Sequence, residues 1–337
     1  MSPFLASTKK KWYGMLAAVG LMAAAFAASL LFGRTPMTVA IVIEAFTNYD
    51  SSSIEHIIIH TERLPRAVIA LIAGASLAVA GALMQALTRN PLASPGVFGI
   101  NAGAVFFIVL AVVLFKVSAL DQLMWYGFLG AAVSAVIVYA LGSIGRDGLT
   151  PIKIVLAGTA ITALFVSFTQ AILVLNEAGL QDVMFWLAGS VSGRSLDMLL
   201  PVLPYILIAG VIALFMGRAV NLLITGDDIA KGMGQNILLV KIVMGILIVL
   251  LAGGSVAVVG SVGFIGLVVP HLSRAFVGND YRWLIPYSGV LGMVLLLTAD
   301  VVARLLIMPA EVPIGVMTAL VGGPFFIYIA RKGVSKL

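Results

Sequence analysis

The ionisable side chains that could do chemistry within the apolar part of this sequence are few. Asp300 and Arg304 lie four residues apart near the end of a long apolar stretch, a spacing that favours an ion pair on one helix face. The alternative is that Asp300 carries protons, although no second acid or histidine is expected at comparable depth to form a relay. His56 and His60 have the spacing of a metal-binding pair, but no HExxH motif accompanies them, so we interpret them as surface residues.

The usual motifs of enzyme catalysis are missing from the sequence. There is no cysteine, which excludes disulfides and thiolate metal sites. There is also no GxxxxGK[ST] phosphate-binding loop, and no carboxylate pair or nucleophile constellation in a plausible position. We therefore expect neither enzymatic activity nor a metal or cofactor held by this chain.

The composition is that of a membrane protein. Hydrophobic residues make up 61% of the chain and charged residues only 10%, against about 25% charged residues in soluble domains. The net charge of +6 does not predict a nucleic-acid partner, because the basic residues are dispersed around hydrophobic segments. Nine segments of 17 to 32 residues contain no Asp, Glu, Lys or Arg: 12–33, 67–88, 90–115, 122–145, 154–176, 198–217, 242–273, 283–299 and 312–330.

These segments predict an all-α polytopic membrane protein. A helix of about 20 residues crosses a hydrocarbon core of about 30 Å, and a helix satisfies its own backbone polar groups. Basic residues flank the first segment at Lys9–Lys11 and follow the last segment between 331 and 336, which predicts two cytoplasmic ends. Two ends on one side require an even number of crossings, so we divide the long segment 242–273 near Gly260–Gly263.

The resulting ten spans agree with the distribution of charge. They place fourteen of the twenty Lys and Arg residues inside and six outside, as the positive-inside rule requires. The first segment, 12–33, is longer than the apolar core of a signal peptide and is interpreted as a retained span. We expect one transmembrane domain over residues 1–337, embedded in membrane lipid.

A weak internal repeat relates the second and seventh spans. At an offset of 179 residues, the thirteen residues from Ala73 and those from Ala252 are identical at six positions. Two spans five crossings apart run in opposite directions, so the match predicts an inverted repeat of the kind found in transporters. Its small residues equally favour close helix packing.

Several segments between the spans have their own signals. Asp227 and Asp228 after Gly226 predict the N-cap of a short cytoplasmic helix over 229–233, and Gly234 can end it. Such a helix suits insertion into a groove of another protein, and the alternative is a capped connector.

We expect Pro91 and Pro270 to interrupt their helices. The segment 183–193 is too short to span the membrane and is expected to lie along the outer surface or dip into the mouth.

A series of motifs in this order resembles the FecCD family of ABC-transporter permeases, and the resemblance covers essentially the whole chain. The motifs are RLPR (Arg63–Arg66), GALMQALTRNPLASPGVFGINAGA (Gly81–Ala104), GDDIAKGMG (Gly226–Gly234), GFIGLVVPHLSRAFVG (Gly263–Gly278), ADVVARLL (Ala299–Leu306) and ExPIG (Glu311–Gly315). The family imports ferric siderophores, haem and cobalamin in bacteria. The resemblance implies the fold of cobalamin-importer permeases, with ten helices in each of two subunits around a central path.

The resemblance also implies roles for particular residues. The ATPase-coupling region 219–241 contains Gly226, Asp227, Asp228, Ile229, Ala230, Lys231, Gly232 and Gly234. The residues implied to receive acidic side chains of a substrate-binding protein are Arg63, Arg66 and Arg304. The residues implied to form the cytoplasmic gate or line the path are Asn90, Leu92, Ala157, Thr159, Thr162 and Thr169.

The resulting expectation is a subunit of an ABC importer for ferric siderophores in the bacterial cytoplasmic membrane. Its expected partners are a second permease subunit, identical or related, a pair of ATP-binding subunits that use the ATP, and an extracytoplasmic binding protein. Haem and cobalamin are alternative substrates. An ion-gradient-driven secondary transporter, suggested by the repeat and Asp300, and a membrane scaffold without transport activity are the rival function classes.

Overall fold

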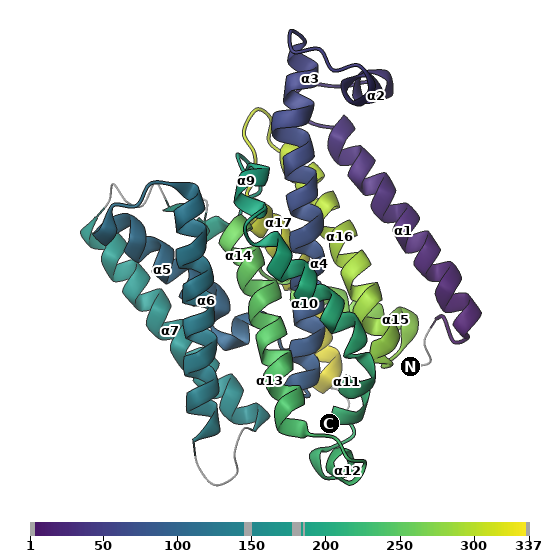
Figure 1. The fold of residues 1–337 in the computed structure, drawn as a ribbon, viewed down its shortest axis with the longest axis vertical. Helices are drawn as coiled ribbons and strands as arrows, with labels where there is room; N and C mark the ends of the chain where they lie inside the picture. Colours follow the sequence, from purple (N-terminus) through teal and green to yellow (C-terminus); the bar gives the residue numbers. More distant parts are fainter. Residues whose placement is uncertain (1–3, 145–149, 177–182, 185, 335–337) are drawn as a thin grey trace.

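The computed structural model of the chain describes residues 4–144, 150–176, 183–184 and 186–334. Within these residues the regular secondary structure is entirely helical (Figure 1). The helices are α1 (Thr8–Leu31), α2 (Val39–Thr47), α3 (Ile54–Ile58), α4 (Leu64–Leu87), α5 (Ile100–Phe115), α6 (Leu120–Ser143), α7 (Pro151–Leu175), α9 (Leu196–Leu199), α10 (Leu203–Phe215), α11 (Gly217–Leu223), α12 (Asp227–Gly232), α13 (Ile237–Ile248), α14 (Gly254–Val259), α15 (Ile265–Val277), α16 (Tyr281–Leu305) and α17 (Ile314–Val334). Two π-helical segments, Ile59–Arg63 and Val249–Gly253, join α3 to α4 and α13 to α14, and a 3-10 turn covers Pro95–Phe98.

The apolar helices fall on the predicted spans in order. The described part of the chain contains six helices long and apolar enough to cross a membrane, or seven if α10 and α11, which meet at a bend of 60°, form one span. The shorter apolar helices α5, α15 and α17 occupy the other three predicted spans. The all-α, multi-pass fold is confirmed. The count of ten crossings stays a prediction, because the 13 residues of α15 extend only about 20 Å.

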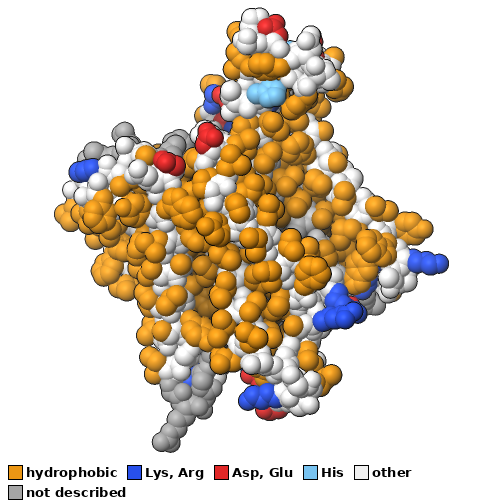
Figure 2. All heavy atoms as spheres, in the orientation of Figure 1, with side chains coloured by type: hydrophobic (Ala, Val, Ile, Leu, Met, Phe, Trp, Pro, Cys, Tyr) orange, Lys and Arg blue, Asp and Glu red, His pale blue; other side chains and the backbone are white. Residues whose placement is uncertain are grey.

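The surface of the molecule has the layering of a membrane protein. Figure 2 shows hydrophobic side chains over the middle of the molecule and charged side chains near its upper and lower ends and at its left and right edges. Both ends of the chain lie toward the end of the molecule that carries α12 (Figure 1), as an even number of crossings requires. That this end faces the cytoplasm is still inferred from the charge distribution alone.

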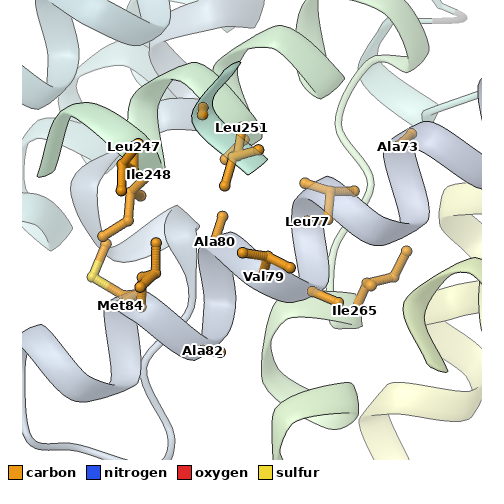
Figure 3. Packing of buried hydrophobic residues seen from close by; sticks show 14 of the residues in the cluster. Ala73, Leu77, Val79, Ala80, Ala82, Met84, Leu247, Ile248, Leu251 and Ile265 are labelled. Carbon is orange, nitrogen blue, oxygen red and sulfur yellow. The ribbon is translucent and has the colours of Figure 1, made fainter. Parts of the chain in front are cut away.

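Helix α4 is the central element of the bundle. In its most apolar stretch 78% of the residues are buried, against 22% in α1. It packs against α13, α14, α15 and α16, and Figure 3 shows Leu77, Ala80 and Met84 of α4 directed toward neighbouring helices. At two crossings the backbones themselves are in contact. A Cβ atom on Gly74 would lie 2.3 Å from the carbonyl oxygen of Gly292, and one on Gly81 would lie 2.0 Å from that of Gly266.

The two segments matched by the internal repeat run in opposite directions. Helix α4 descends toward the end that carries α12, whereas α13 and α14 rise from it (Figure 1). This direction is the one that the predicted inverted repeat requires. The local structures differ, because Gly81 lies within α4 while Gly260, its counterpart, ends α14 with a φ of +75°. The repeat over the whole chain stays a prediction.

The predicted division of segment 242–273 is confirmed. Helix α14 ends at Val259 and α15 begins at Ile265. The backbone groups at this break need partners within the protein, because lipid offers none. Ser190 N–H donates to the carbonyl of Val259 at 2.8 Å, and Ser261 N–H donates to that of Trp186 at 2.9 Å. The segment around 186–190 therefore dips into the bundle, one of the two arrangements expected for it.

The expectation that Pro270 interrupts its helix was wrong. Helix α15 continues through Pro270, because a side chain from α4 replaces the missing backbone donor. The amide of Gln85 donates to the carbonyl oxygens of Gly266 and Leu267 at 3.3 and 3.4 Å. Pro91, in contrast, lies in the loop after α4, as expected.

We predict that Gly81→Ala lowers the thermal stability of the purified protein. The added methyl group would lie 2.0 Å from the carbonyl oxygen of Gly266, so α4 and α15 must move apart. Overpacking of this kind costs about 1–3 kcal/mol, which corresponds to a decrease in Tm of about 1–4 °C for a chain of this length. The measurement is thermal unfolding in detergent.

Gly245→Ala in α13 is the matched control, because a Cβ atom there meets nothing within 4 Å. Its Tm should equal or slightly exceed that of the wild type, since alanine favours the helix. Equal Tm values for the two variants would contradict the backbone contact between α4 and α15.

Candidate functional site

A buried ionic network lies at the outer end of α4 and α16. Arg304 Nη2 donates to Asp300 Oδ2 at 2.8 Å, so the ion pair predicted from their spacing is confirmed. Arg66 Nε donates to Asp300 Oδ1 at 2.8 Å, and Arg66 Nη1 donates to Glu311 Oε2 at 2.7 Å. The Asp300 side chain is 0% exposed. Two guanidinium groups therefore compensate a carboxylate that water does not reach.

The network corrects the expectation that no second acid lies near Asp300. Glu311 joins it through Arg66, which stands between the two acids. Burial by itself raises the pKa of Glu311. Hydrogen bonds from Arg66 and Ser192 and the charges of Arg66 and Arg34 lower it by more, so the pKa of Glu311 lies below its ordinary value. A carboxylate with a lowered pKa is ionised at neutral pH, which disfavours a proton relay at this place.

Two arginines cap the outer end of α1. The last carbonyl groups of a helix have no partner within the helix. Arg63 Nη1 donates to the carbonyl oxygens of Leu30 and Leu31 at 2.5 and 2.8 Å. Arg304 Nη1 donates to that of Ser29 at 3.0 Å, and its Nη2 donates to Ser29 Oγ at 2.6 Å. Both side chains are buried.

The three arginines of the predicted docking site converge on one pocket. This outer pocket has a volume of about 410 Å³ and is lined by Gly33, Arg34, Thr35, Ile58, Thr61, Glu62, Arg63, Arg66, Ser192, Gly193, Arg194, Arg304 and Glu311. Arg63, Arg66 and Arg304 are buried and held by partners within the chain. The side chain of Arg34, at 58% exposure, lies at the surface with its Nε 3.7 Å from Glu311 Oε1. Arg34 and Arg194 are among the six Lys and Arg residues that the predicted topology places outside, but the sequence carried no signal that joins them to the other three arginines.

Arg194 is the least satisfied cation of the outer pocket. Its side chain is 6% exposed, and its Cζ lies 4.2 Å from the centre of the Trp186 ring. Its Nη1 lies 3.9 Å from Met198 Sδ, a weak acceptor. Nε and Nη2 meet no hydrogen-bond partner among the residues that the structure describes. Burial lowers the pKa of Arg194 to about 10, so it stays charged at neutral pH.

The short helix α12 forms the opposite end of the molecule. It begins at Asp227 rather than Ile229, and Gly226, with a φ of +125°, is its N-cap. The expectation that Asp227 caps the helix was wrong, because its carboxylate is bound elsewhere. Lys241 Nζ lies 2.8 Å from Oδ2, and Arg89 Nη2 lies 2.5 Å from Oδ1. Burial raises the pKa of Asp227, but these cations outweigh it and hold the pKa below its ordinary value.

The end of α12 follows the prediction for Gly234. This glycine has a φ of +83°, the left-handed conformation that follows many helices. Its N–H donates to the carbonyl of Lys231, and the N–H of Gln235 donates to that of Ala230, both at 2.9 Å. These two bonds form a Schellman motif, so α12 has defined ends.

One face of α12 is buried and the other presents apolar side chains to the solvent. Ala230 is buried, whereas Ile229 and Met233, four residues apart, are 55% and 69% exposed. Asp228 and Lys231 are also exposed. Ile229 and Met233 therefore form a small exposed apolar face at this end of the molecule.

Arg89 connects α12 to the predicted gate segment. It follows α4, has a φ of +47°, and donates through Nη2 to the carbonyl of Leu223 at 2.8 Å as well as to Asp227. In the next residue, Asn90 Oδ1 accepts a hydrogen bond from the N–H of Leu92 at 2.9 Å. The two predicted gate residues thus form one turn directly after Arg89. Sequence reasoning missed Arg89, because its partner lies 138 positions away.

The remaining predicted path residues lie on α7 in different environments. Thr162 Oγ1 donates to the carbonyl of Gly96 at 3.4 Å, which braces the turn after the gate segment. Thr169 is buried and donates to the carbonyl of Phe165 within its own helix at 2.7 Å. Thr159 is exposed and Ala157 is half-buried. The exposed positions of α7 include small or polar residues that the sequence did not single out, Ala160, Ala163, Ser167 and Gln170. They also include large apolar residues: Leu156, Leu164, Val166 and Phe168.

Comparison with known proteins decides the family. Residues 21–332 match the FecCD transport family. The chain belongs to this family. YfiZ of Bacillus subtilis, described as a siderophore transport system permease, is 53% identical over 323 residues, which cover 96% of this chain and 97% of YfiZ. YfmD of the same organism, an Fe(3+)-citrate import system permease, is 43% identical over 305 residues, or 90% of each chain.

A solved structure supports the same conclusion for the fold. It is an inward-facing transporter assigned to the metal-chelate type of ABC transporters, with a TM-score of 0.83 and 29% identity. The match covers 94% of this chain and 98% of that one. The resemblance read from the motifs is confirmed, and this FecCD chain has the fold of an ABC-transporter permease.

We predict that Asp300→Asn strongly destabilises the protein. The amide leaves Arg66 and Arg304 close together in a buried site without the carboxylate that both of them bind. Removing one partner of a buried ion pair costs about 3–5 kcal/mol, which corresponds to a decrease in Tm of about 4–7 °C for a chain of this length. The measurement is thermal unfolding of the purified protein in detergent.

Glu44→Gln serves as the control, because Glu44 is an exposed acid in α2. This change should leave the Tm within about 1 °C of the wild type. If Asp300→Asn unfolded at the same temperature as Glu44→Gln, the network would not support the outer end of the bundle.

Proposed function

We propose that this chain is the membrane-spanning subunit of a bacterial ABC importer that carries ferric siderophores across the cytoplasmic membrane. The observation that carries the proposal is the ionic link from α12 through Asp227 and Arg89 to the gate segment, in a chain of the FecCD family. YfiZ, a relative described as a siderophore transport permease, supports the choice of substrate. The whole chain, residues 1–337, is one permease domain in this proposal.

The proposed assembly contains a second permease subunit, identical or related, and a pair of cytoplasmic ATP-binding subunits. The exposed apolar side of α12, with Ile229 and Met233, supports a contact with the ATP-binding subunits. The exposed side of α7 supports a position beside the path between two permease subunits. Both chain ends face the cytoplasm, as the distribution of basic residues indicates.

The proposed mechanism moves a solute without breaking any of its bonds, so the chain is not an enzyme. ATP binding closes the partner subunits and displaces the coupling region 219–241. Asp227 transmits this motion to Arg89, and the turn of Asn90 and Leu92 moves with it. Substrate then passes along α7, where the proposed path includes Ala157, Thr159, Thr162 and Thr169.

On the outer side, the proposed partner is a substrate-binding protein whose acidic side chains meet Arg63, Arg66 and Arg304. Burial of these arginines adds a condition to this proposal. Incoming carboxylates must enter the outer pocket, because the guanidinium groups do not form a flat exposed surface. Substitutions of these arginines therefore disturb α1 and the network with Asp300 as well as docking.

The ion-driven alternative has less support. Its carrier would be Asp300, which is bound by two guanidinium groups. Both of its oxygen atoms are engaged by these cations, so the structure favours a structural ion pair at this position. Haem or cobalamin in place of a ferric siderophore would use the same mechanism, so the substrate is decided by uptake measurements.

We predict that Asp227→Asn uncouples ATP hydrolysis from transport. The amide keeps the shape of the side chain but loses the charge that binds Arg89 and Lys241. Stimulation of ATPase activity by loaded binding protein should fall by about tenfold in the reconstituted complex, the effect of losing about 1.4 kcal/mol of coupling. Asp121→Asn, an exposed acid in the first turn of α6, should retain full stimulation. Full stimulation of the Asp227→Asn complex would refute the link.

We predict that deletion of the gene abolishes uptake of radiolabelled ferric siderophore and that the wild-type gene restores it. Uptake should continue when a protonophore collapses the proton gradient and stop when ATP is depleted, because a separate ATPase supplies the energy. Labelled haem and cobalamin, tested in parallel, identify the substrate class. Uptake that stops with the proton gradient while ATP is maintained would favour the secondary transporter.

A further inference from the structure

A buried cation with two unbonded nitrogen atoms lies in the wall of the outer pocket. The docking residues implied by the family resemblance do not include it. Arg194 is 6% exposed, and its Nε and Nη2 are unbonded within the described part of the chain. A buried polar group without a hydrogen bond costs free energy, and a charged one costs more. The ring of Trp186, 4.2 Å away, compensates part of the charge but offers no acceptor to these two nitrogen atoms.

The two unbonded nitrogen atoms define the chemistry of the missing partner. Nε and Nη2 lie on one edge of the planar guanidinium group, and their hydrogen atoms point in parallel. This edge matches the two oxygen atoms of a carboxylate, which accept such a pair of bonds. Two acids at the outer pocket are already engaged, because Asp300 binds Arg66 and Arg304 and Glu311 binds Arg66. Glu62 also lines the pocket but does not bond to Nε or Nη2 of Arg194.

The charge of the pocket favours the same class of ligand. Five of the thirteen residues that line it are arginines and two are glutamates, which leaves three positive charges in excess. A pocket with walls of low dielectric constant concentrates this field on an anion that enters it. The volume of about 410 Å³ admits a carboxylate side chain or a small polycarboxylate such as citrate.

We propose that Arg194 is the receiving group of an anion site in the outer pocket, where a carboxylate accepts two parallel hydrogen bonds from its Nε and Nη2. The proposal rests on the proposed function, since the anion arrives either as an acidic side chain of the docked binding protein or as a carboxylate of the iron chelate. Arg194 forms no bond with Asp300, so its contribution to this site is separable from the network that stabilises the outer end of α4 and α16.

The first arm of the test detects a small carboxylate directly. The complete transporter, without binding protein, is heated in citrate and in chloride at equal ionic strength. Citrate should raise the Tm of the wild type by about 2 °C or more, since a ligand that binds only the folded state stabilises it. The increase in Tm should disappear in Arg194→Gln. It should be partly retained in Arg194→Lys, because lysine keeps the positive charge but cannot donate two parallel hydrogen bonds to one carboxylate.

The second arm measures docking of the binding protein to the reconstituted transporter. If the carboxylate comes from the binding protein, Arg194→Gln should weaken docking by about tenfold, and citrate should compete with docking to the wild type. If it comes from the chelate, docking should stay unchanged and only the response to citrate should be lost. Lys116→Gln, a cation outside the pocket at the outer end of α5, should behave as the wild type in both arms.

A transporter in which Arg194→Gln leaves both the citrate response and docking within about twofold of the wild type overturns the proposal. The Tm values in chloride show whether each variant is folded. Failure of the proposed function has a different signature, because a wild-type complex that transports no ferric chelate would still report on Arg194 through citrate.

Discussion

The bundle depends on the backbone contact between α4 and its neighbours α15 and α16. Glycine at positions 74, 81, 266 and 292 lets these helices meet without intervening side chains. Between lipid-soluble helices there is little hydrophobic driving force, so van der Waals contact at such crossings supplies much of the association energy. Because α4 is held on several sides, it can act as a rigid element between the outer pocket and the gate segment.

The ionic groups at the two ends of α4 differ in burial, and this difference has a mechanical meaning. At the outer end, Arg66 and Asp300 are almost fully removed from solvent, so breaking their pair is costly. At the inner end, Arg89 and Asp227 are more than one third exposed. Exposed pairs contribute about 0–1 kcal/mol, so the inner pair can break and reform during a transport cycle. The ion pair at the outer end therefore stays intact, whereas the ion pair at the inner end can open and close.

The arginines of the outer pocket have structural tasks in addition to the proposed contact with a binding protein. Arg63 and Arg304 satisfy the last carbonyl groups of α1, and Arg66 holds two acids. Uptake defects in variants of these residues would therefore mix folding with docking. Arg194 and the exposed Arg34 are free of these backbone bonds, which makes them the cleaner probes of the outer surface.

The sequence by itself determined the helical, multi-pass architecture, the break after Val259 and the left-handed end of α12 at Gly234. These features follow from local rules, since hydrocarbon requires long apolar helices and a left-handed residue favours glycine. It also determined the family, through long motifs in a fixed order. The sequence left open which partners the charged residues take. Only the tertiary structure brought Arg66 to Asp300, 234 positions away. It also left Nε and Nη2 of Arg194 without an acceptor among the described residues, because such partners depend on how the helices cross in three dimensions.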